Sequence, residues 1–161
     1  MKLFTNIQEF KIYLEKLSIP TLRLAKPVEH KDYSNINWND IKLEQIDDNG
    51  HNIINLGVYI DNTLEEGIAL DVQLVGDYFQ LHPTIHENLQ GQGLGFKIYK
   101  KFIHEFGNIY SAKGRRLNPI IIKLLNKFKN GDEYTYLDKN GSILIILKAN
   151  PDHDELVESF K

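Results

Sequence analysis

The sequence contains no cysteine among its 161 residues. This absence excludes disulfides, zinc sites built on thiolates and catalysis by a thiol nucleophile. A chain without cysteine is compatible with the reducing cytoplasm, and a cytoplasmic location is therefore what we expect.

Long hydrophobic runs are missing as well. No stretch of the sequence approaches the roughly 20 apolar residues that a helix needs to cross a bilayer. The first nine residues, MKLFTNIQE, are too polar and become charged too early for a signal peptide. We therefore expect no signal peptide and no membrane association.

An excess of positive charge is also absent, because the formal net charge is -3. Proteins that bind nucleic acids in general need a basic surface for the phosphates, so the charge argues against that class. One cluster, Lys113-Gly114-Arg115-Arg116, departs from the acidic balance. It fits either a contact with an anionic group or an ordinary solvated loop.

The composition that remains is that of an ordinary globular protein, with 42% hydrophobic and 25% charged residues. A chain of 161 residues fits one domain, which we expect to span residues 1–161. Such a domain buries roughly 70% of its unfolded surface and needs neither disulfide nor metal to fold.

The N-terminal part predicts a helix and then a less regular segment. Asn6 and Glu9 resemble a capping box, and the helix should stop before Pro20. Residues 21–25 fit a short strand, and residues 26–40 fit a polar loop or an irregular helix. The apolar residues on the predicted helical face are Ile7, Phe10, Leu14 and Leu17.

Strand patterns dominate the middle and the end of the chain. Asn-Gly between apolar runs is the strongest short-range hairpin signal, and it occurs at Asn49-Gly50 and Asn140-Gly141. Pro83 does not fit a central strand because it has no N–H, so it predicts a bulge or a point where the strand leaves its neighbour. The predicted strands are residues 41–46, 52–61, 68–75, 78–86, 109–112, 134–137 and 142–148.

Two amphipathic helices lie between these strands. The first should end at Gly107, and the second should begin with Asn118 as its cap and Pro119 at its first position. Residues 151–161 predict only a frayed helical turn. The predicted buried stripes are Ile98, Tyr99, Phe102, Ile103 and Phe106 in the first helix, and Ile120, Ile121, Leu124, Leu125 and Phe128 in the second.

A glycine-rich loop, Gln90-Gly91-Gln92-Gly93-Leu94-Gly95, joins a predicted strand to the first of these helices. Glycines let the backbone N–H groups approach a ligand, and the helix start adds a positive dipole end. The arrangement suits a phosphate or pyrophosphate, although glycines also make plain tight turns. A Rossmann site is disfavoured because the third glycine of its motif would fall at Phe96, and no Lys-Ser or Lys-Thr follows for a P-loop.

This loop resembles the Q/R-x-x-G-x-G/A motif of the GNAT superfamily of N-acetyltransferases. Ile85 occupies the apolar strand position that precedes the motif, and Asn118 matches the Asn that starts the next helix. The specific part of the resemblance covers residues 78–128, and the N-terminal third matches only in the order of elements. The resemblance implies an α+β fold, with a bent mixed sheet of about six or seven strands flanked by helices. The fourth and fifth strands would splay apart.

The resemblance also implies acetyl-CoA as co-substrate, bound in the splay and transferred by direct attack of an amine. The amine would belong to a small molecule or to a protein, and a homodimer is compatible with the sequence. The resemblance implies no metal. The implied cofactor-binding residues are Pro83, Thr84, Ile85, Gln90, Gly91, Gln92, Gly93, Leu94, Gly95, Phe96 and Asn118. Lys113, Arg115 and Arg116 are candidates for the 3′-phosphate of coenzyme A.

The catalytic groups depart from the family pattern. Leu125 stands where many members have a Tyr that protonates the thiolate, and Lys113 stands where some have a Glu base. The candidate catalytic residues are therefore His82, His86 and Glu87. An unperturbed His titrates near pH 6.5 and can accept a proton from an ammonium group.

Other interpretations of these residues stay open. His82 and His86 share one face of a predicted strand, but no third metal ligand is evident. Tyr110 and Tyr134 are alternative proton donors. The whole chain is also compatible with a non-catalytic GNAT-like binding domain, or with an unrelated α+β domain whose glycine loop is only a turn.

Overall fold

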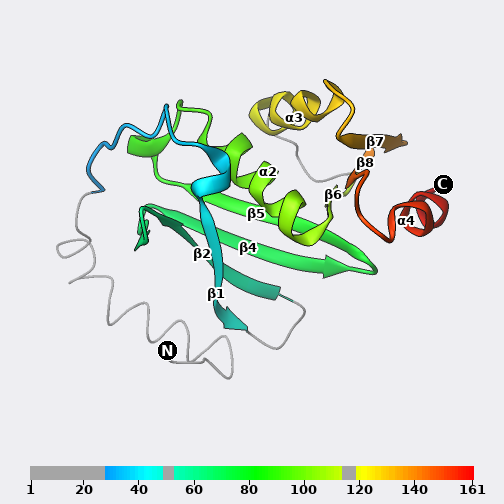
Figure 1. Cartoon of the computed structure of the whole chain (residues 1–161), viewed down its shortest axis with the longest axis horizontal. Helices are drawn as coiled ribbons and strands as arrows, with labels where there is room; N and C mark the ends of the chain where they lie inside the picture. Colours follow the sequence, from blue (N-terminus) through cyan, green and yellow to red (C-terminus); the bar gives the residue numbers. More distant parts are fainter. Residues whose placement is uncertain (1–27, 49–52, 114–118) are drawn as a thin grey trace.

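A mixed β-sheet forms the centre of the computed structural model, which describes residues 28–48, 53–113 and 119–161 (Figure 1). The strand order is β1-β2-β4-β5-β6-β8-β7, and the two-residue β3 pairs with β2. Only the β5–β6 pair among the described strands is parallel. The strands are β1 (Lys42–Asp48), β2 (Ile53–Ile60), β3 (Thr63–Leu64), β4 (Ile68–Val75), β5 (Tyr78–Ile85), β6 (Asn108–Ser111), β7 (Tyr134–Lys139) and β8 (Ser142–Leu147).

Helices flank this sheet, which confirms the predicted α+β class with a mixed sheet. None of the helices in the described ranges is long and apolar enough to cross a membrane. The predicted helix at residues 6–17 and the strand at 21–25 lie outside the described residues. The helices are α2 (Leu94–Phe106), α3 (Pro119–Asn126) and α4 (His153–Phe160), with short 3-10 helices η1 (Trp38–Asp40), η2 (Glu87–Leu89) and η3 (Lys127–Lys129).

The main core lies between α2 and one face of the sheet, and Figure 1 shows α2 lying over β5. Phe102 is 1% exposed and meets Phe79 of β5 edge-on, with ring centroids 5.6 Å apart. Burial of a side chain of this kind stabilises the fold by about 1.5–3 kcal/mol. The predicted stripe of α2 is buried except for Phe106, which is 40% exposed because it lies at the last position of the helix.

A second, smaller core lies on the other face of the sheet. Leu144 and Ile146 of β8 alternate with Ile143 and Ile145, so the two pairs face opposite sides of the sheet. The C-terminal helix α4 covers the first pair with Leu156 and Phe160. The prediction of a frayed turn at residues 151–161 is therefore wrong, because these two side chains fix a full helix against β8.

The hairpin predicted at Asn140-Gly141 is present, and β4 and β5 form another. The β4–β5 register runs without a break from Ile68↔Ile85 to Val75↔Tyr78. The β7–β8 turn has positive φ at both Asn140 (54°) and Gly141 (94°), as the favoured two-residue hairpin turn requires. The turn at Asn49-Gly50 lies outside the described residues, although β1 and β2 on either side of it pair as expected.

The parallel pair β5–β6 splays apart. Its register contains the single pair Gln80↔Tyr110, whereas β5 continues to Ile85. Pro83 lies in this diverging half, and its pairing with Leu70 of β4 is regular. Of the two interpretations of Pro83, the structure therefore favours the point where a strand leaves its neighbour. If the two-residue β3 is not counted, the fourth and fifth strands in sequence order are β5 and β6, the pair that was predicted to splay apart.

Candidate functional site

A cavity of about 550 Å³ opens where β5 diverges from β6, between the end of β5 and helix α3. Its volume is within the range typical of small-molecule sites. The N-terminus of α2 and the glycine-rich loop form one wall. The lining residues are Pro83, Ile85, Leu89, Gln90, Gly91, Gly93, Leu94, Gly95, Phe96, Ile120, Ile121, Lys123, Leu124 and Lys127.

The glycine loop has a backbone that only glycine adopts easily. Gly91 and Gly93 have φ of 81° and 73°, and Gly93 is the N-cap of α2. A Cβ added to either residue would meet no heavy atom within 4 Å, so both glycines face open space. No side chain caps this helix start and its first turn has no acidic residue, so it favours an anion in the cavity.

Gly95 has a different role, because it permits close packing. A Cβ at Gly95 would lie 3.2 Å from Leu124 Cδ1 and 3.7 Å from Ile85 Cδ1. The glycine thus brings α2, α3 and the end of β5 together behind the cavity. Ile120 of α3 was predicted to be buried, and that prediction is wrong: the side chain is 67% exposed and lines the cavity.

Two lysines supply positive charge to the cavity. Lys123 of α3 and Lys127 of η3 both line it, and Lys127 Nζ lies 5.2 Å from the centroid of the Phe96 ring. The sequence pointed instead to the cluster at 113–116 as phosphate contacts. Lys113 lines a separate cavity, and the two arginines of the cluster lie outside the described residues.

The two glutamines of the motif do different things. Gln90 lines the cavity, and its Nε2 donates to the backbone oxygen of Ile85 at 2.8 Å. Gln92 does not line the cavity: its Oε1 accepts from the backbone N–H of Tyr33, and its Nε2 donates to the backbone oxygens of Lys31 and Leu89. The side chain of Gln92 therefore ties the loop to the segment at residues 28–36.

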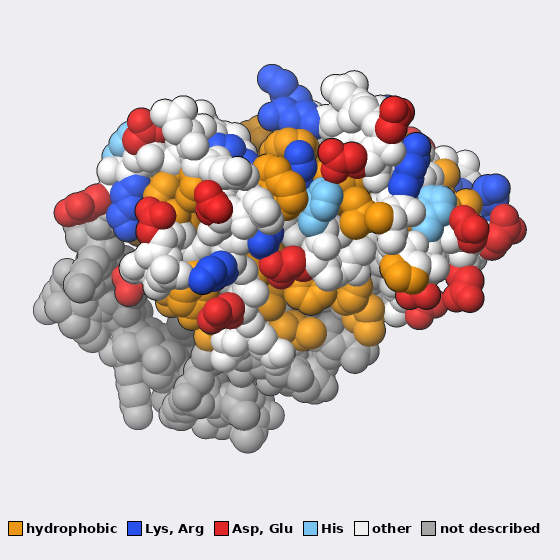
Figure 2. Space-filling model, in the orientation of Figure 1, with side chains coloured by type: hydrophobic (Ala, Val, Ile, Leu, Met, Phe, Trp, Pro, Cys, Tyr) orange, Lys and Arg blue, Asp and Glu red, His pale blue; other side chains and the backbone are white. Residues whose placement is uncertain are grey.

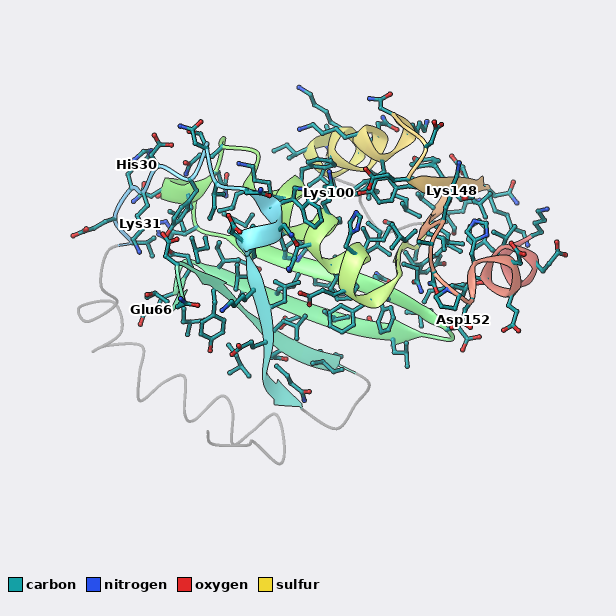
Figure 3. The ribbon with its side chains drawn as sticks, in the orientation of Figure 1. His30, Lys31, Glu66, Lys100, Lys148 and Asp152 are labelled. Carbon is teal, nitrogen blue, oxygen red and sulfur yellow. The ribbon has the colours of Figure 1, made fainter. Side chains whose placement is uncertain are left out.

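That segment is held in turn by the buried carboxylate of Glu65, which is 3% exposed. Lys31 Nζ and the backbone N–H of Gly67 donate to it at 3.0 and 3.1 Å, and the Tyr33 hydroxyl donates as well. Burial alone would raise the pKa of Glu65, but these hydrogen bonds outweigh it and the net pKa is lowered. Figure 3 shows Lys31 at the same end of the molecule as Glu66, the neighbour of Glu65.

The structure thus brings most of the predicted cofactor-binding residues to one cavity. Thr84 is exposed on the other side of β5 and does not line it, and Asn118 lies outside the described residues. The sequence did not predict that Lys123 and Lys127 line the cavity, because nothing in their sequence pattern distinguishes them from ordinary surface lysines. It also missed Glu65, whose role depends on contacts with residues far away in sequence. Those predicted residues that do line the cavity are Pro83, Ile85, Gln90, Gly91, Gly93, Leu94, Gly95 and Phe96.

The candidate catalytic residues do not line the cavity. His82 lies on the face of β5 opposite Pro83, directly across from Asp71 of β4, and Asp71 is in turn across from Asn55 of β2. Residues directly opposite on antiparallel strands share a face, so these three form a polar row. His86 Nδ1 accepts from the backbone N–H of Asn88 at 3.1 Å, and Glu87 is exposed in η2.

The alternative proton donors, Tyr110 and Tyr134, do not line the first cavity either. Tyr134 is buried and its hydroxyl lies 2.8 Å from His104 Nε2, and burial together with the nearby Glu133 raises the pKa of Tyr134 to about 12. Leu125 is 3% exposed and belongs to the core. Tyr110 lies on β6 beside the divergence.

Among the described residues, no three His, Asp or Glu side chains come together as metal ligands.

The fold and the cavity define an α+β protein with a glycine-loop site at the start of a helix, between two splayed parallel strands. No protein-family model matches the chain, and no curated protein matches its sequence. Among solved structures, the chain is similar to a protein from Bacteroides thetaiotaomicron that is assigned to the GNAT family of acetyltransferases. The identity is 14%, the TM-score is 0.38, and the match covers 93% of this chain and 90% of that chain.

Proposed function

We propose that the chain is an acetyl-CoA-dependent N-acetyltransferase of the GNAT type, which transfers acetyl to an amine by direct attack. The observation that carries the proposal is the cavity at the splay of β5 and β6, lined by the glycine loop that resembles the GNAT motif. A glycine loop that served only as a turn would need neither the divergence of the strands nor a cavity at that point.

The lining chemistry supports a ligand with a phosphate end and an extended arm. The backbone of Gly91 to Gly95 and the α2 N-terminus would bind the pyrophosphate of acetyl-CoA. The pantetheine arm would lie along Pro83 and Ile85, on the edge of β5 where this strand has diverged from β6. The acetyl thioester supplies the carbonyl that an amine attacks.

His82 is the residue that we propose as the base. Direct transfer needs a neutral amine, so a group near the thioester must accept a proton from the ammonium form. His82 lies two positions beyond Gln80, the last β5 residue paired with β6, and it projects to the face opposite the cofactor cavity. Asp71, directly across from it, is suited to orienting an imidazole. His86 and Glu87 are second choices, because they lie beyond the end of β5.

A non-catalytic GNAT-like binding protein is the alternative, and one observation favours it. The position of the usual Tyr acid is filled by Leu125, which is buried in the core and does not line the cavity. Such a protein would bind acetyl-CoA without turning it over in the presence of any amine. Turnover with a single amine would decide against it.

We expect a cytoplasmic location, an amine as substrate and no general binding of nucleic acids. On the face shown in Figure 2, acidic and basic side chains are interspersed. The net charge of -3 argues against the basic surface that binding to phosphate backbones requires.

Calorimetric titration with acetyl-CoA tests the proposed function directly, with free coenzyme A as the comparison. A thermal-shift experiment has a calculable size, since ligand at 100 times its Kd stabilises the native state by about 2.7 kcal/mol. The melting temperature should then rise by about 5–10 °C, at roughly 2–4 °C per kcal/mol. If the folded protein shows no binding at millimolar acetyl-CoA, the proposal fails and the glycines form only a turn.

The double substitution Lys123→Gln and Lys127→Gln should weaken acetyl-CoA binding about tenfold. Each exposed lysine contributes up to about 1 kcal/mol of attraction to a phosphate, and salt should weaken wild type more than the variant. Calorimetry at two salt concentrations measures both effects. Lys129→Gln is the matched control, since Lys129 shares η3 with Lys127 but does not line the cavity. Equal affinities of wild type and the double variant would contradict the assignment.

A further inference from the structure

A second cavity, of about 410 Å³, lies beside the start of β5 and the β7–β8 turn. Tyr78 of β5 lines it, whereas Pro83 and Ile85 of the same strand line the first cavity. Side chains alternate along a strand, so Tyr78 and Pro83 point to opposite faces of the sheet. The lining residues are Tyr78, Tyr110, Lys113, Lys139, Asn140, Ser142, Ser159 and Phe160.

The floor of this second cavity is aromatic. The Tyr78 and Tyr110 rings are tilted against each other with centroids 5.5 Å apart, and Phe160 of α4 meets both edge-on at 6.1 and 6.5 Å. The Tyr78 hydroxyl and Ser159 Oγ share a hydrogen bond of 2.6 Å. Side chains from two strands and the C-terminal helix thus give the cavity a fixed apolar base.

The rim of the second cavity is cationic. Lys113 and Lys139 are exposed, and neither forms an ion pair within the part of the chain that the structure describes. The stem of Lys113 would lie 3.4 Å from a Cβ at Gly141, which brings this lysine close to the turn that follows Lys139. The nearest carboxylate in the turn, Asp138, accepts a hydrogen bond from the Gly141 N–H at 3.0 Å. Two exposed lysines therefore line the same cavity as the aromatic side chains.

The second cavity also touches the divergence of β5 and β6. Tyr110, which lines it, is the β6 partner of Gln80 in the one pair that joins these strands. Beyond this pair the strands separate, and the first cavity opens on the other face. The two cavities therefore lie on opposite faces of the sheet and meet at the divergence through Tyr110, an arrangement that would let a donor and an acceptor approach each other.

We propose that the second cavity is the acceptor site and that it takes a small amine carrying a carboxylate or a phosphate. This inference rests on the proposed acetyltransferase function. Lys113 and Lys139 bind the anionic group, while the aromatic floor carries the body of the molecule toward Tyr110 and the gap. Its volume of about 410 Å³, with Ser159 and Phe160 of α4 in the lining, is within the size range of small-molecule sites.

The chemistry of the transfer balances with this placement. The ammonium form of the acceptor loses one proton to a base such as His82 or to solvent. The neutral nitrogen then attacks the thioester carbon, so that a C–N bond forms as the C–S bond breaks. A second proton leaves the nitrogen and ends on the departing sulfur, giving an amide and a thiol. The carboxylate or phosphate takes no part, which is why it is held at the rim.

Matched pairs of amines test this site without any cofactor present. Phenylalanine is compared with phenylethylamine, and phosphoethanolamine with ethanolamine, by titration of the full chain followed by NMR. We expect the member with the carboxylate or phosphate, in at least one pair, to bind at least about tenfold more tightly than the counterpart that lacks this group, with shifts at Tyr78, Tyr110 and Lys113. The two pairs distinguish a carboxylate from a phosphate. Equal binding within both pairs, or no response at millimolar probe, would overturn the proposal.

Substitutions locate the site. Lys113→Gln with Lys139→Gln should raise the Kd of the probe that carries the carboxylate or phosphate about tenfold, and it should not weaken the binding of the counterpart without that group. Lys148→Gln is the matched control. Lys148, which is labelled in Figure 3, follows β8 at the end opposite Ser142, and the rise of a strand puts it about 20 Å from Ser142. If the control weakens the binding of the probe with the carboxylate or phosphate as much as the double variant does, general charge attraction explains the binding and the site is wrong.

The outcomes separate this inference from the proposed function. Acetyl-CoA binding without any probe response overturns the acceptor site alone. A probe response without acetyl-CoA binding overturns the acetyltransferase, and with it the acceptor role, and leaves an anion-binding cavity. When both bind, mass spectrometry of the mixture should find the acetylated amine that carries the carboxylate or phosphate in excess over the acetylated counterpart without that group.

Discussion

Gly93→Trp should weaken acetyl-CoA binding by at least about a hundredfold, or about 2.8 kcal/mol of binding free energy, while the protein still folds. Gly93 caps α2 within the cavity wall, and open space surrounds the position of an added Cβ. An indole there would therefore occupy the space proposed for the pyrophosphate without displacing the core. Calorimetry with acetyl-CoA measures the loss, and circular dichroism checks the fold.

The matched control is Gly76→Trp in the β4–β5 turn. Gly76 has φ of 60° and also has no heavy atom within 4 Å of an added Cβ. Both substitutions thus force a bulky residue into the left-handed region, at a cost of roughly 1–2 kcal/mol in stability. Only the substitution at Gly93 should affect binding. Wild-type affinity in the Gly93 variant would show that the loop does not face the ligand.

Local sequence signals predicted the elements whose structure is determined locally. Asn140-Gly141 predicted its hairpin because few residue pairs adopt positive φ twice in succession. The spacing of Ile98, Phe102 and Ile103 predicted the buried face of α2 for a similar reason, since one helical period decides it. These patterns depend on residues that are neighbours in the chain.

Elements that depend on distant contacts were predicted poorly. α4 has only a few apolar residues, and it is a full helix because Leu156 and Phe160 pack against β8. Ile120 fits the apolar stripe of α3, but nothing in its own helix shows that a cavity lies beside it. The polarity pattern of a segment does not reveal which other segment or cavity lies against it in the folded protein.

The candidate site shows the same division. The motif located the loop and the wall of the cavity, because backbone geometry and glycine positions are encoded together. It did not reveal that the Gln92 side chain bonds Tyr33 and Lys31, about 60 positions earlier in the chain. The period of β5 put His82 on the face away from Pro83, whereas its neighbour Asp71 became known only from the strand register.

Glu65→Gln should lower the free energy of unfolding by about 2–3 kcal/mol at neutral pH. The carboxylate is 3% exposed and accepts from Lys31, Tyr33 and Gly67, and an amide has one oxygen where the carboxylate has two. One donor would therefore face an NH₂ group in the interior, which costs the full desolvation of a polar group. Urea unfolding measures the loss. Glu66→Gln is the matched control, since Glu66 is exposed and its substitution should change stability by less than about 0.5 kcal/mol.

The pH dependence of the Glu65 effect has a definite sign. The folded-state pKa of Glu65 is lowered from its ordinary value of 4.5, so its contribution is complete above that value and is lost as pH falls through the folded pKa. Wild type and Glu65→Gln should therefore differ most above pH 4.5 and converge in strong acid. A difference that stays constant down to pH 2 would mean that the loss comes from packing and not from charge.

The same substitution should also weaken acetyl-CoA binding, although Glu65 does not line the cofactor cavity. Glu65 holds Tyr33, the backbone of Tyr33 holds Gln92, and Gln92 lies within the glycine loop. A loop that is less firmly held must lose more conformational freedom when the ligand binds, so affinity should fall by about tenfold or less. Tyr33→Phe removes the hydroxyl but keeps the backbone bond to Gln92, and it should cost less affinity than Glu65→Gln. If Glu65→Gln destabilises the fold and leaves affinity unchanged, the segment at residues 28–36 stabilises the protein without positioning the loop.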